Sequence, residues 1–386
     1  MRNKNFWKGF AAAVAVMVVV TFGGGALVHR GVVPLDWLPD GLARIAKTNI
    51  LLDYLEENYV DEFNSRMAEE LMYTGLAAGA GDTYTYYLSA EMMAQQTEKN
   101  SGHFVGIGVD VTVNEEGYCQ IVSVTAGGPA EAAGIQTGDV IVEVDGESVD
   151  GVDANEVVSR IKGEEGTEVA LGVRRGEDIL TLTVTRQDIQ VTTVEGRMLE
   201  DGIGYISISA FRENTYDQFR EALDALLAEG MEGLVLDLRD NTGGLVPTAY
   251  EIGEELLPEG TMVYTLDKEG NRKDLVCDAQ YLDLPLVVLV NGYSASASEI
   301  LAGAIQDTGR GELIGTQTFG KGLIQRLYTL SDGSGINVTI QKYYTPNGTS
   351  IHGVGLTPDL VVEQPEEGGE DLQLAAALSR MAEKMN

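Results

Sequence analysis

The sequence predicts an α/β core of layered sheet and helices, with an inserted β-rich domain, a helical N-terminal arm and one N-terminal transmembrane helix. After residue 189, apolar runs of strand length alternate with helical patterns, an order typical of helices packed on a largely parallel sheet. Residues 98–189 instead hold short apolar runs in close succession, and residues 9–28 form one long uncharged segment. The chain has 386 residues, enough for about two or three domains.

The composition argues against nucleic acid as a partner. The chain carries 26 basic and 60 acidic side chains, and its formal net charge of −34 repels phosphate backbones. Cys119 and Cys277 lie far apart, with no metal-ligand spacing around either. We therefore expect no metal site, no cofactor and no disulfide framework. The chain has three histidines, which restricts the choice of a catalytic base.

The N-terminus predicts a membrane anchor. Arg2, Lys4 and Lys8 precede the uncharged run at residues 9–28, which is long enough to cross a bilayer as one helix. No clear cleavage site follows, so a retained signal-anchor is favoured over a removed signal peptide. Residues 1–30 are then a cytoplasmic stub and a transmembrane segment. The expected location is the cell membrane, single-pass, with the later domains outside the cytoplasm.

Two helical regions flank the chain's centre. In residues 31–97, apolar side chains recur at spacings near three, four and seven from Leu42 to Gln96. No catalytic-looking residue accompanies them, so we interpret this region as an arm or interface element. A second helix is expected from Leu372 to Met385, within the C-terminal residues 366–386. The two helical ends are candidates for pairing in a homodimer.

The β-rich domain at residues 98–189 resembles a PDZ domain. One helix is expected at 155–161, and the predicted strands are 105–113, 120–124, 140–144, 168–174 and 179–185. The run G-G-P-A-E-A-A-G-I-Q-T-G-D-V-I at residues 127–141 is similar to the PDZ signature, in which a short helix and a glycine turn lead into a buried strand.

The resemblance implies that this domain binds the free C-terminus of a protein or peptide substrate. PDZ domains add an extended peptide to a sheet and hold its carboxylate in a glycine-containing loop. The segment that fits this loop consists of Phe104, Val105, Gly106, Ile107, Gly108 and Val109. The glycines permit positive φ and let N–H groups converge on one anion. The alternative is that Gly106 and Gly108 only form a bulge at the start of a strand.

Residues 190–365 form the predicted α/β core. The expected strands are 204–209, 234–238 and 286–290, and the expected helices are 216–229, 246–257 and 297–306. Ligands in such cores bind beyond the carboxyl ends of the strands. The candidate catalytic residues of this chain follow those strand ends.

Ser296 is the candidate nucleophile. It lies in the run S-A-S-A-S-E at 294–299, between a buried strand and a helix. Free backbone N–H groups and the positive end of a helix dipole favour a developing oxyanion at such a turn. The alternative is that these serines only cap the helix. Ser294 or Ser298 can supply such a cap while Ser296 projects elsewhere.

Lys321 is the candidate base. It stands between Gly320 and Gly322 in a stretch of mostly apolar and small residues. Lysines are usually solvated, but a lysine in a dry site loses ammonium stability and its pKa falls. The neutral amine can then take a proton from a serine, so no histidine is required.

The two blocks around Ser296 and Lys321 resemble the catalytic blocks of the carboxyl-terminal processing (tail-specific) protease family. These blocks read N-G-Y-S-A-S-A-S-E at 291–299 and T-F-G-K-G-L-I-Q at 318–325. The resemblance extends over nearly the whole chain after residue 42 and implies a crotonase/ClpP-like core. It also implies Ser296 as nucleophile, Lys321 as base and Gln325 as an assisting residue. One helical turn brings residues four apart close together, so we expect helix at 321–325.

A third block supplies the expected oxyanion hole. The run D-L-R-D-N-T-G-G at residues 237–244 resembles the family's D-L-R-x-N-x-G-G block, which provides one donor amide. Carried over, the donors are Gly243 or Gly244 together with Ala297. A simple tight turn is the alternative reading of the glycines.

The function implied by the resemblance is a serine endopeptidase that recognises substrate C-termini and cleaves through an acyl-enzyme. Two rival hypotheses stay open. One is a Ser-His-Asp hydrolase that uses His352, since residues 292–296 loosely match the nucleophile motif G-x-S-x-G without its final glycine. The other is a non-catalytic PDZ adaptor tethered to the membrane.

Overall fold

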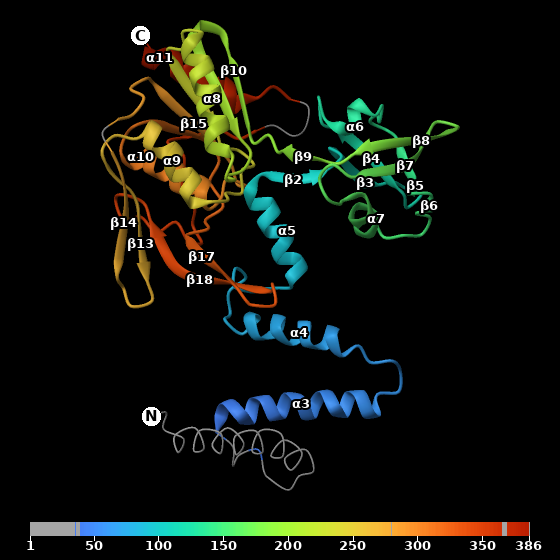
Figure 1. Ribbon diagram of the computed structural model, residues 1–386. Helices are drawn as coiled ribbons and strands as arrows, with labels where there is room; N and C mark the ends of the chain where they lie inside the picture. The colour runs from blue at the N-terminus through green and yellow to red at the C-terminus, as the bar shows by residue number, and fades with distance from the viewer. Residues whose placement is uncertain (1–34, 36–38, 279, 365–368, 386) are drawn as a thin grey trace, which may run out of the picture. The chain divides into compact units, whose positions relative to one another are not determined.

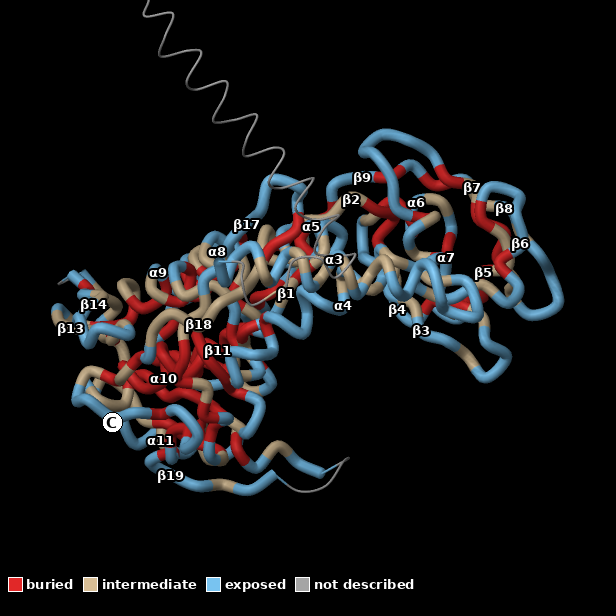
Figure 2. The backbone as a smooth tube through the Cα atoms, turned by 90° about the horizontal axis from the view of Figure 1, so that it is seen from below, coloured by how far each residue is buried: buried red, intermediate tan, exposed pale blue. Residues whose placement is uncertain are grey.

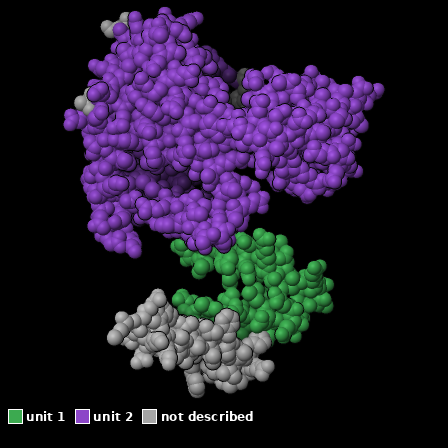
Figure 3. Space-filling view, viewed as in Figure 1, with its two compact units in different colours: residues 1–83 green, residues 84–386 purple. Residues whose placement is uncertain are grey.

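The computed structural model describes residues 35, 39–278, 280–364 and 369–385 (Figure 1). The chain forms two compact units, residues 1–83 and residues 84–386, coloured separately in Figure 3. The membrane span expected at residues 9–28 lies outside the described residues. Among those that are described, no helix combines the length and apolarity that a bilayer crossing needs.

The first unit contains helices α3 (Asp40–Asn58) and α4 (Ser65–Ala78). Asn64 caps α4, because its side chain accepts a hydrogen bond of 3.0 Å from the Met67 amide. Helix α3 buries no residue, and both helices expose large apolar side chains. The helical pattern does not continue unbroken to Gln96, because strand β1 (Tyr86–Leu88) interrupts it before helix α5 (Ala90–Ser101).

The β-rich part of the second unit has a sheet of order β3-β4-β5-β7-β8, with β6 paired to β5. Its strands are β3 (Val109–Val113), β4 (Cys119–Val124), β5 (Val140–Val144), β6 (Glu147–Ser148), β7 (Glu168–Arg175) and β8 (Asp178–Thr185), and its helices are α6 (Pro129–Ala132) and α7 (Ala154–Ile161). The apolar faces of sheet and helices enclose a core of their own.

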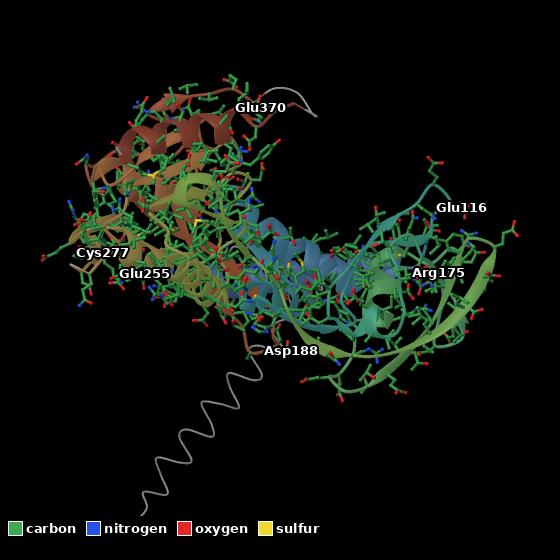
Figure 4. The ribbon with its side chains drawn as sticks, turned by 90° about the horizontal axis from the view of Figure 1, so that it is seen from above. Glu116, Arg175, Asp188, Glu255, Cys277 and Glu370 are labelled. Carbon is green, nitrogen blue, oxygen red and sulfur yellow. The ribbon has the colours of Figure 1, made fainter. Side chains whose placement is uncertain are left out.

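A pair of short strands connects this part to the rest of the unit. Strand β2 (His103–Gly106) pairs antiparallel with β9 (Gln187–Gln190). His103 Nδ1 lies 3.2 Å from an oxygen of Asp188, which Figure 4 labels on this connection. The single strand expected at 105–113 is therefore wrong. It divides into β2 and β3, because Gly108 has φ +77° and turns the chain between them.

The α/β part is built on a six-stranded sheet of order β10-β11-β12-β15-β16-β19. Only its edge strand β10 runs antiparallel. The strands are β10 (Val194–Met198), β11 (Ile203–Ile208), β12 (Gly233–Asp237), β15 (Leu286–Val290), β16 (Glu312–Gly315) and β19 (Leu360–Val361), and a 3₁₀ turn covers Glu200–Gly202. Strands β12 and β15 are buried throughout, as expected for a sheet covered on both faces.

Helices cover both faces of this sheet. Helices α8 (Thr215–Ala228), α9 (Val246–Leu256) and α10 (Ala297–Asp307) share one core cluster with one face, and α11 (Leu372–Met385) packs in a second cluster with the other. Figure 2 shows the tube around α10 as predominantly buried. The predicted α/β alternation is confirmed here.

A second sheet completes the layers, with order β1-β18-β13-β14 and β17 paired to β18. Its further strands are β13 (Gly260–Asp267), β14 (Arg272–Cys277), β17 (Leu323–Thr329) and β18 (Gly335–Tyr344). Buried residues of β13, β14 and β18 belong to the same cluster as α9 and α10, so these helices lie between the two sheets. The loop before β17 contacts the turn after β15, where the Phe319 amide donates to the Ser294 carbonyl at 3.1 Å.

Candidate active site

Ser296 lies at a strained turn between β15 and α10. It occupies the N-cap position of α10 with φ 57° and ψ −113°, and its exposed fraction is 9%. Positive φ in a residue other than glycine costs about 1–3 kcal/mol and persists only where surrounding contacts enforce it. A serine nucleophile on a sharp strand-to-helix turn has this kind of backbone.

The flanking serines fasten this turn to the loop after β12. Ser294 Oγ donates to the Leu238 carbonyl at 2.7 Å, and Ser298 Oγ donates to the Asn241 carbonyl at 2.8 Å. Both serines are fully buried. The expectation that one of them caps the helix is wrong, because Ser296 itself takes the cap position and its neighbours bind the adjacent loop.

Asn241 organises the loop that carries the two candidate oxyanion glycines. Its buried side chain donates to the Ile208 carbonyl at 2.9 Å and accepts from the Gly243 amide at 2.9 Å. Gly243 has φ +99°, and a Cβ atom there would lie 2.8 Å from the Ser296 Cβ. Only glycine fits at this approach of the loop to the serine turn.

The donor amides around Ser296 differ in availability. The Gly243 N–H is engaged by Asn241. Within the described part of the chain, the N–H groups of Gly244 and Ala297 have no acceptor. Of the two glycines, Gly243 lies against the serine turn but its amide is bound, whereas Gly244 lies against Phe211 and its amide has no acceptor in the described ranges.

Lys321 lies in the loop between β16 and β17. Gly320 before it has φ +92°, and a Cβ there would meet the Gly355 nitrogen at 2.8 Å, so this loop packs directly on the backbone of residues 351–355. Burial lowers the pKa of the Lys321 amine, and the Glu299 carboxylate opposes this shift. The Lys321 Nζ atom lies 4.7 Å from the centre of the Tyr84 ring.

A single buried carboxylate joins the serine turn to the lysine loop. Glu299 is 0% exposed, and its Oε2 atom accepts from the amides of Ser296 and Lys321, each at 2.9 Å. The two amide nitrogens therefore lie within about 6 Å of each other. Its Oε1 atom accepts from Thr318 Oγ1 at 2.6 Å and from the Gly320 amide at 2.7 Å. One buried carboxylate therefore accepts all four hydrogen bonds and fixes the backbones of Ser296 and Lys321.

Tyr343 of β18 also connects these two segments, through their carbonyl oxygens. Its hydroxyl lies 3.0 Å from the Ser296 carbonyl oxygen and also contacts the Lys321 carbonyl oxygen. Burial raises the pKa of Tyr343 well above its ordinary value, so the hydroxyl stays a neutral donor. Glu299 thus binds the amides of the nucleophile and base candidates, and Tyr343 contacts their carbonyls.

The side chains of the predicted catalytic residues are not all in contact. No hydrogen bond joins Ser296 Oγ to Lys321 Nζ among the described residues. The helical turn expected at 321–325 is wrong, because β17 begins at Leu323 and pairs with β18. Gln325 lies on this strand, and its side-chain amide donates to Thr339 Oγ1 at 3.2 Å.

His352 lacks the surroundings of a triad histidine. It is exposed, and its ring makes no hydrogen bond to Ser296 or to a carboxylate in the described ranges. Its backbone lies against Gly322, where a Cβ would meet the His352 nitrogen at 2.7 Å. A base needs an orienting partner and hydrogen-bond reach to its nucleophile, and the ring of His352 shows neither among the described residues.

The segment expected to bind a carboxylate lines an apolar groove. Edge strand β3 leaves one side of its sheet open, and helix α7 lies beside it. A cavity of about 80 Å³ between them is lined by Phe104, Gly106, Ile107, Gly108, Val109, Val111, Val158, Ile161 and Lys162. Val105 does not line it and instead pairs with Asp188.

Among the described residues, no group of His, Cys, Asp or Glu is arranged to hold a metal ion.

Three site residues were not recognised from the sequence: Glu299, Asn241 and Tyr343. Ser296 and Glu299 have the S-x-x-E spacing of a capping box, which predicts a carboxylate folded back on the serine amide. That spacing was the one available signal. It does not indicate that the same carboxylate also binds the lysine loop.

A layered α/β core with a serine on a strained strand-to-helix turn, next to free amides and a desolvated lysine, is typical of a serine hydrolase. Comparisons with known proteins agree. The peptidase family S41 matches residues 202–362, and the PDZ domain family matches residues 120–175. The chain therefore belongs to peptidase family S41 and is a serine peptidase that carries a PDZ domain.

Similar proteins span most of the chain. A carboxyl-terminal-processing protease of Synechocystis sp. is 36% identical, over 94% of this chain and 89% of its own length. A protein of the same name from Picosynechococcus sp. is 39% identical, over 78% of this chain and 76% of its own. The solved structure of a photosystem II D1 C-terminal processing protease is 33% identical with a TM-score of 0.50, covering 86% of this chain and 89% of that one.

Proposed function

We propose that this peptidase is an endopeptidase that cleaves by a Ser-Lys mechanism and selects substrates by their free C-termini. One observation carries the catalytic part: Glu299 binds the amides of Ser296 and Lys321 through the same oxygen. The nucleophile candidate and the base candidate are therefore neighbours, although 24 residues of chain separate them. The burial that lowers the Lys321 pKa favours the neutral amine that a base requires.

In the proposed reaction, the neutral Lys321 amine takes the proton of Ser296 Oγ as Oγ attacks the peptide carbonyl. The Gly244 and Ala297 amides stabilise the oxyanion. The peptide C–N bond then breaks, and the Lys321 ammonium gives its proton to the leaving amine. Water hydrolyses the resulting ester, with Lys321 accepting the water proton and returning one to Ser296.

Gln325 is proposed to assist Lys321. Its side chain is bonded to Thr339, so this role requires it to exchange that partner for the lysine. A Gln325→Ala variant then loses activity while Thr339→Val, which removes only the alternative partner, keeps it. Equal loss in both variants indicates a structural role for the pair.

The PDZ groove is proposed to bind the substrate's C-terminal residue by strand addition to β3. The apolar lining suits an apolar side chain, and Gly108 gives the adjoining loop its turn. Replacing the C-terminal carboxylate of a peptide substrate by an amide should raise KM with little change in kcat. Unchanged KM would exclude carboxylate recognition.

Catalysis is tested by peptide cleavage and by acylation with a fluorophosphonate reagent. Ser296→Ala should abolish both, and Lys321→Ala should reduce both by several orders of magnitude at unchanged circular dichroism. Lys268→Ala is the matched control, because the Lys268 side chain is 87% exposed and pairs with Glu269. Loss of activity in His352→Ala with an active Lys321→Ala would favour the triad. No cleavage and no labelling of the wild type would favour an adaptor.

Membrane anchoring and dimerisation belong to the same proposal. The basic residues before the uncharged run at 9–28 support a single-pass anchor with the peptidase outside the cytoplasm. Retention of the full chain in membranes after alkaline carbonate extraction is the expected result, and release into the supernatant would exclude the anchor.

The apolar side chains exposed on α3 and α4 support a homodimer.

A further inference from the structure

The side chain of Lys321 contacts an aromatic ring that is distant in sequence. Its Nζ atom lies 4.7 Å from the centre of the Tyr84 ring, within the range of a cation–π interaction. In the part of the chain that the structure describes, Lys321 Nζ forms no ion pair and no hydrogen bond to Ser296 Oγ. The contact that the structure shows for the amine is therefore with the ring, and a hydrogen bond to the Ser296 hydroxyl has still to form for proton transfer.

Tyr84 is held in this place by the strand that also bears Tyr343. The Tyr84 carbonyl accepts from Asn337 Nδ2 at 3.0 Å, and the Thr85 hydroxyl accepts from the Thr339 amide at 3.1 Å. Directly afterwards, β1 pairs with β18. The ring and the Tyr343 hydroxyl thus reach the lysine loop from one continuous sheet.

The charged and titratable groups around Lys321 favour different protonation states. Glu299 of α10 favours the ammonium, but its oxygens are occupied by hydrogen bonds to amides and to Thr318. Tyr343 of β18 stays neutral and contacts the Lys321 carbonyl. The negative face of the Tyr84 ring attracts the ammonium and not the neutral amine. Burial favours the neutral amine.

We propose that Tyr84 is a positioning residue that holds Lys321 as an ammonium in a resting position, in which its Nζ atom is not hydrogen-bonded to Ser296 Oγ. This inference rests on the proposed Ser-Lys mechanism. Catalysis then requires Lys321 to leave the ring, lose its proton and approach Ser296 Oγ. Tyr84 sets the pH at which this occurs, because the ring's attraction is lost on deprotonation.

The test compares Tyr84→Leu, which removes the π face, with Tyr84→Phe, which keeps it. Loss of the ring lowers the Lys321 pKa, so the neutral base is present at lower pH. The rising limb of kcat/KM against pH should move down by about one unit in Tyr84→Leu. It should stay in place in Tyr84→Phe and move up in Tyr84→Trp, whose larger ring binds cations better. Tyr328→Leu, an exposed tyrosine on β17, is the matched control.

A second measurement does not depend on proteolysis. In a Ser296→Ala background, the rate at which an amine-reactive acetylating reagent modifies Lys321 is followed against pH by mass spectrometry. The midpoint should shift in the same directions for the Tyr84 variants. An unchanged midpoint in Tyr84→Leu, or an equal shift in Tyr84→Phe, overturns the role of the ring. If the wild type cleaves no peptide but the acetylation midpoint of Lys321 still shifts in the Tyr84 variants, the Ser-Lys mechanism is refuted and the role of the ring stands.

Discussion

At the scale of single residues, the organisation of the site depends most on Glu299. Glutamine in its place has the same shape but only one acceptor oxygen, so two of the donors that now bind the carboxylate would face an NH₂ group. Leaving buried donors unpaired costs about 1–3 kcal/mol each. We expect Glu299→Gln to lower the free energy of unfolding by about 3 kcal/mol or more and to abolish acylation of Ser296. Urea unfolding and fluorophosphonate labelling measure the two effects.

The matched control is Glu251→Gln, the same change at an exposed position of helix α9. It should alter the free energy of unfolding by less than about 0.5 kcal/mol and leave labelling unchanged. If Glu299→Gln behaves like this control, the carboxylate does not hold the two loops together.

The lowered pKa of Lys321 predicts a pH dependence of stability. The pKa of the folded chain's Lys321 lies below the ordinary 10.5, so between the two values the unfolded chain binds more protons. The contribution of Lys321 to stability therefore improves as pH rises through that window. Relative to Lys321→Met, the wild type should gain unfolding free energy as the pH rises toward 10.5. Parallel pH curves from urea titrations of the two proteins would contradict a lowered pKa.

At the scale of elements, apolar runs were predictable and polar-faced strands were not. Strand β15 and helix α11 begin and end at the expected residues. A five-residue apolar run bounded by turn residues predicts a buried strand, and apolar residues at helical spacing predict a helix. Strands β13, β14, β17 and β18 were not predicted. They pair antiparallel, and most of their positions are half-buried in β13 and β18 and exposed or half-buried in β14 and β17, so their apolar signal is weak.

The helical turn expected at 321–325 illustrates a second cause of error. The expectation assumed a direct contact between Lys321 and Gln325 and deduced the backbone from it. The backbone instead follows sheet pairing, with Leu323 opposite Lys342 and a bulge between Ile324 and Gln325. Hydrogen bonding to a distant strand overrode the local inference, and such a pairing is not visible from residue spacing.

The link from β18 to the two catalytic loops gives a prediction for this sheet. Tyr343→Phe removes the hydroxyl that contacts the Ser296 and Lys321 carbonyls. The Ser296 carbonyl keeps the Ile300 amide as a donor, whereas the Lys321 carbonyl loses the hydroxyl that binds it. We expect a loss of about 1–3 kcal/mol in unfolding free energy and a fall in kcat larger than any change in KM. Steady-state kinetics and urea unfolding provide the measurement.

Tyr344→Phe is the control for this strand. The neighbouring Tyr344 ring stacks on Tyr264 at 5.1 Å, and phenylalanine preserves that contact. Activity should be nearly unchanged in this variant. A comparable loss of kcat in both variants would show that disturbance of the strand, and not the missing hydroxyl, is responsible.

At the scale of the whole molecule, the site is assembled from segments that the sequence cannot place relative to one another. Resemblance to a known family suggested Ser296, Lys321 and the loop at 237–244 as partners. Their residues alone indicated only three separate turns after strands or beside glycines. The contact between Tyr84 and Lys321 joins positions more than 200 residues apart. It depends on β1 being an edge of the second sheet, which no local pattern reveals.

The apolar side chains of α4 give the last prediction. Met67 and Leu71, one helical turn apart, are 61% and 64% exposed, and a helix with such a face is stabilised by a partner. If a second copy covers this face, Met67→Glu with Leu71→Glu should convert the detergent-solubilised full chain from dimer to monomer by multi-angle light scattering, because a buried unpaired charge opposes association. Ile179→Glu, at an equally exposed position of β8, should keep the wild-type mass. A wild type that is already monomeric, or a double variant that stays dimeric, would rule out pairing through α4.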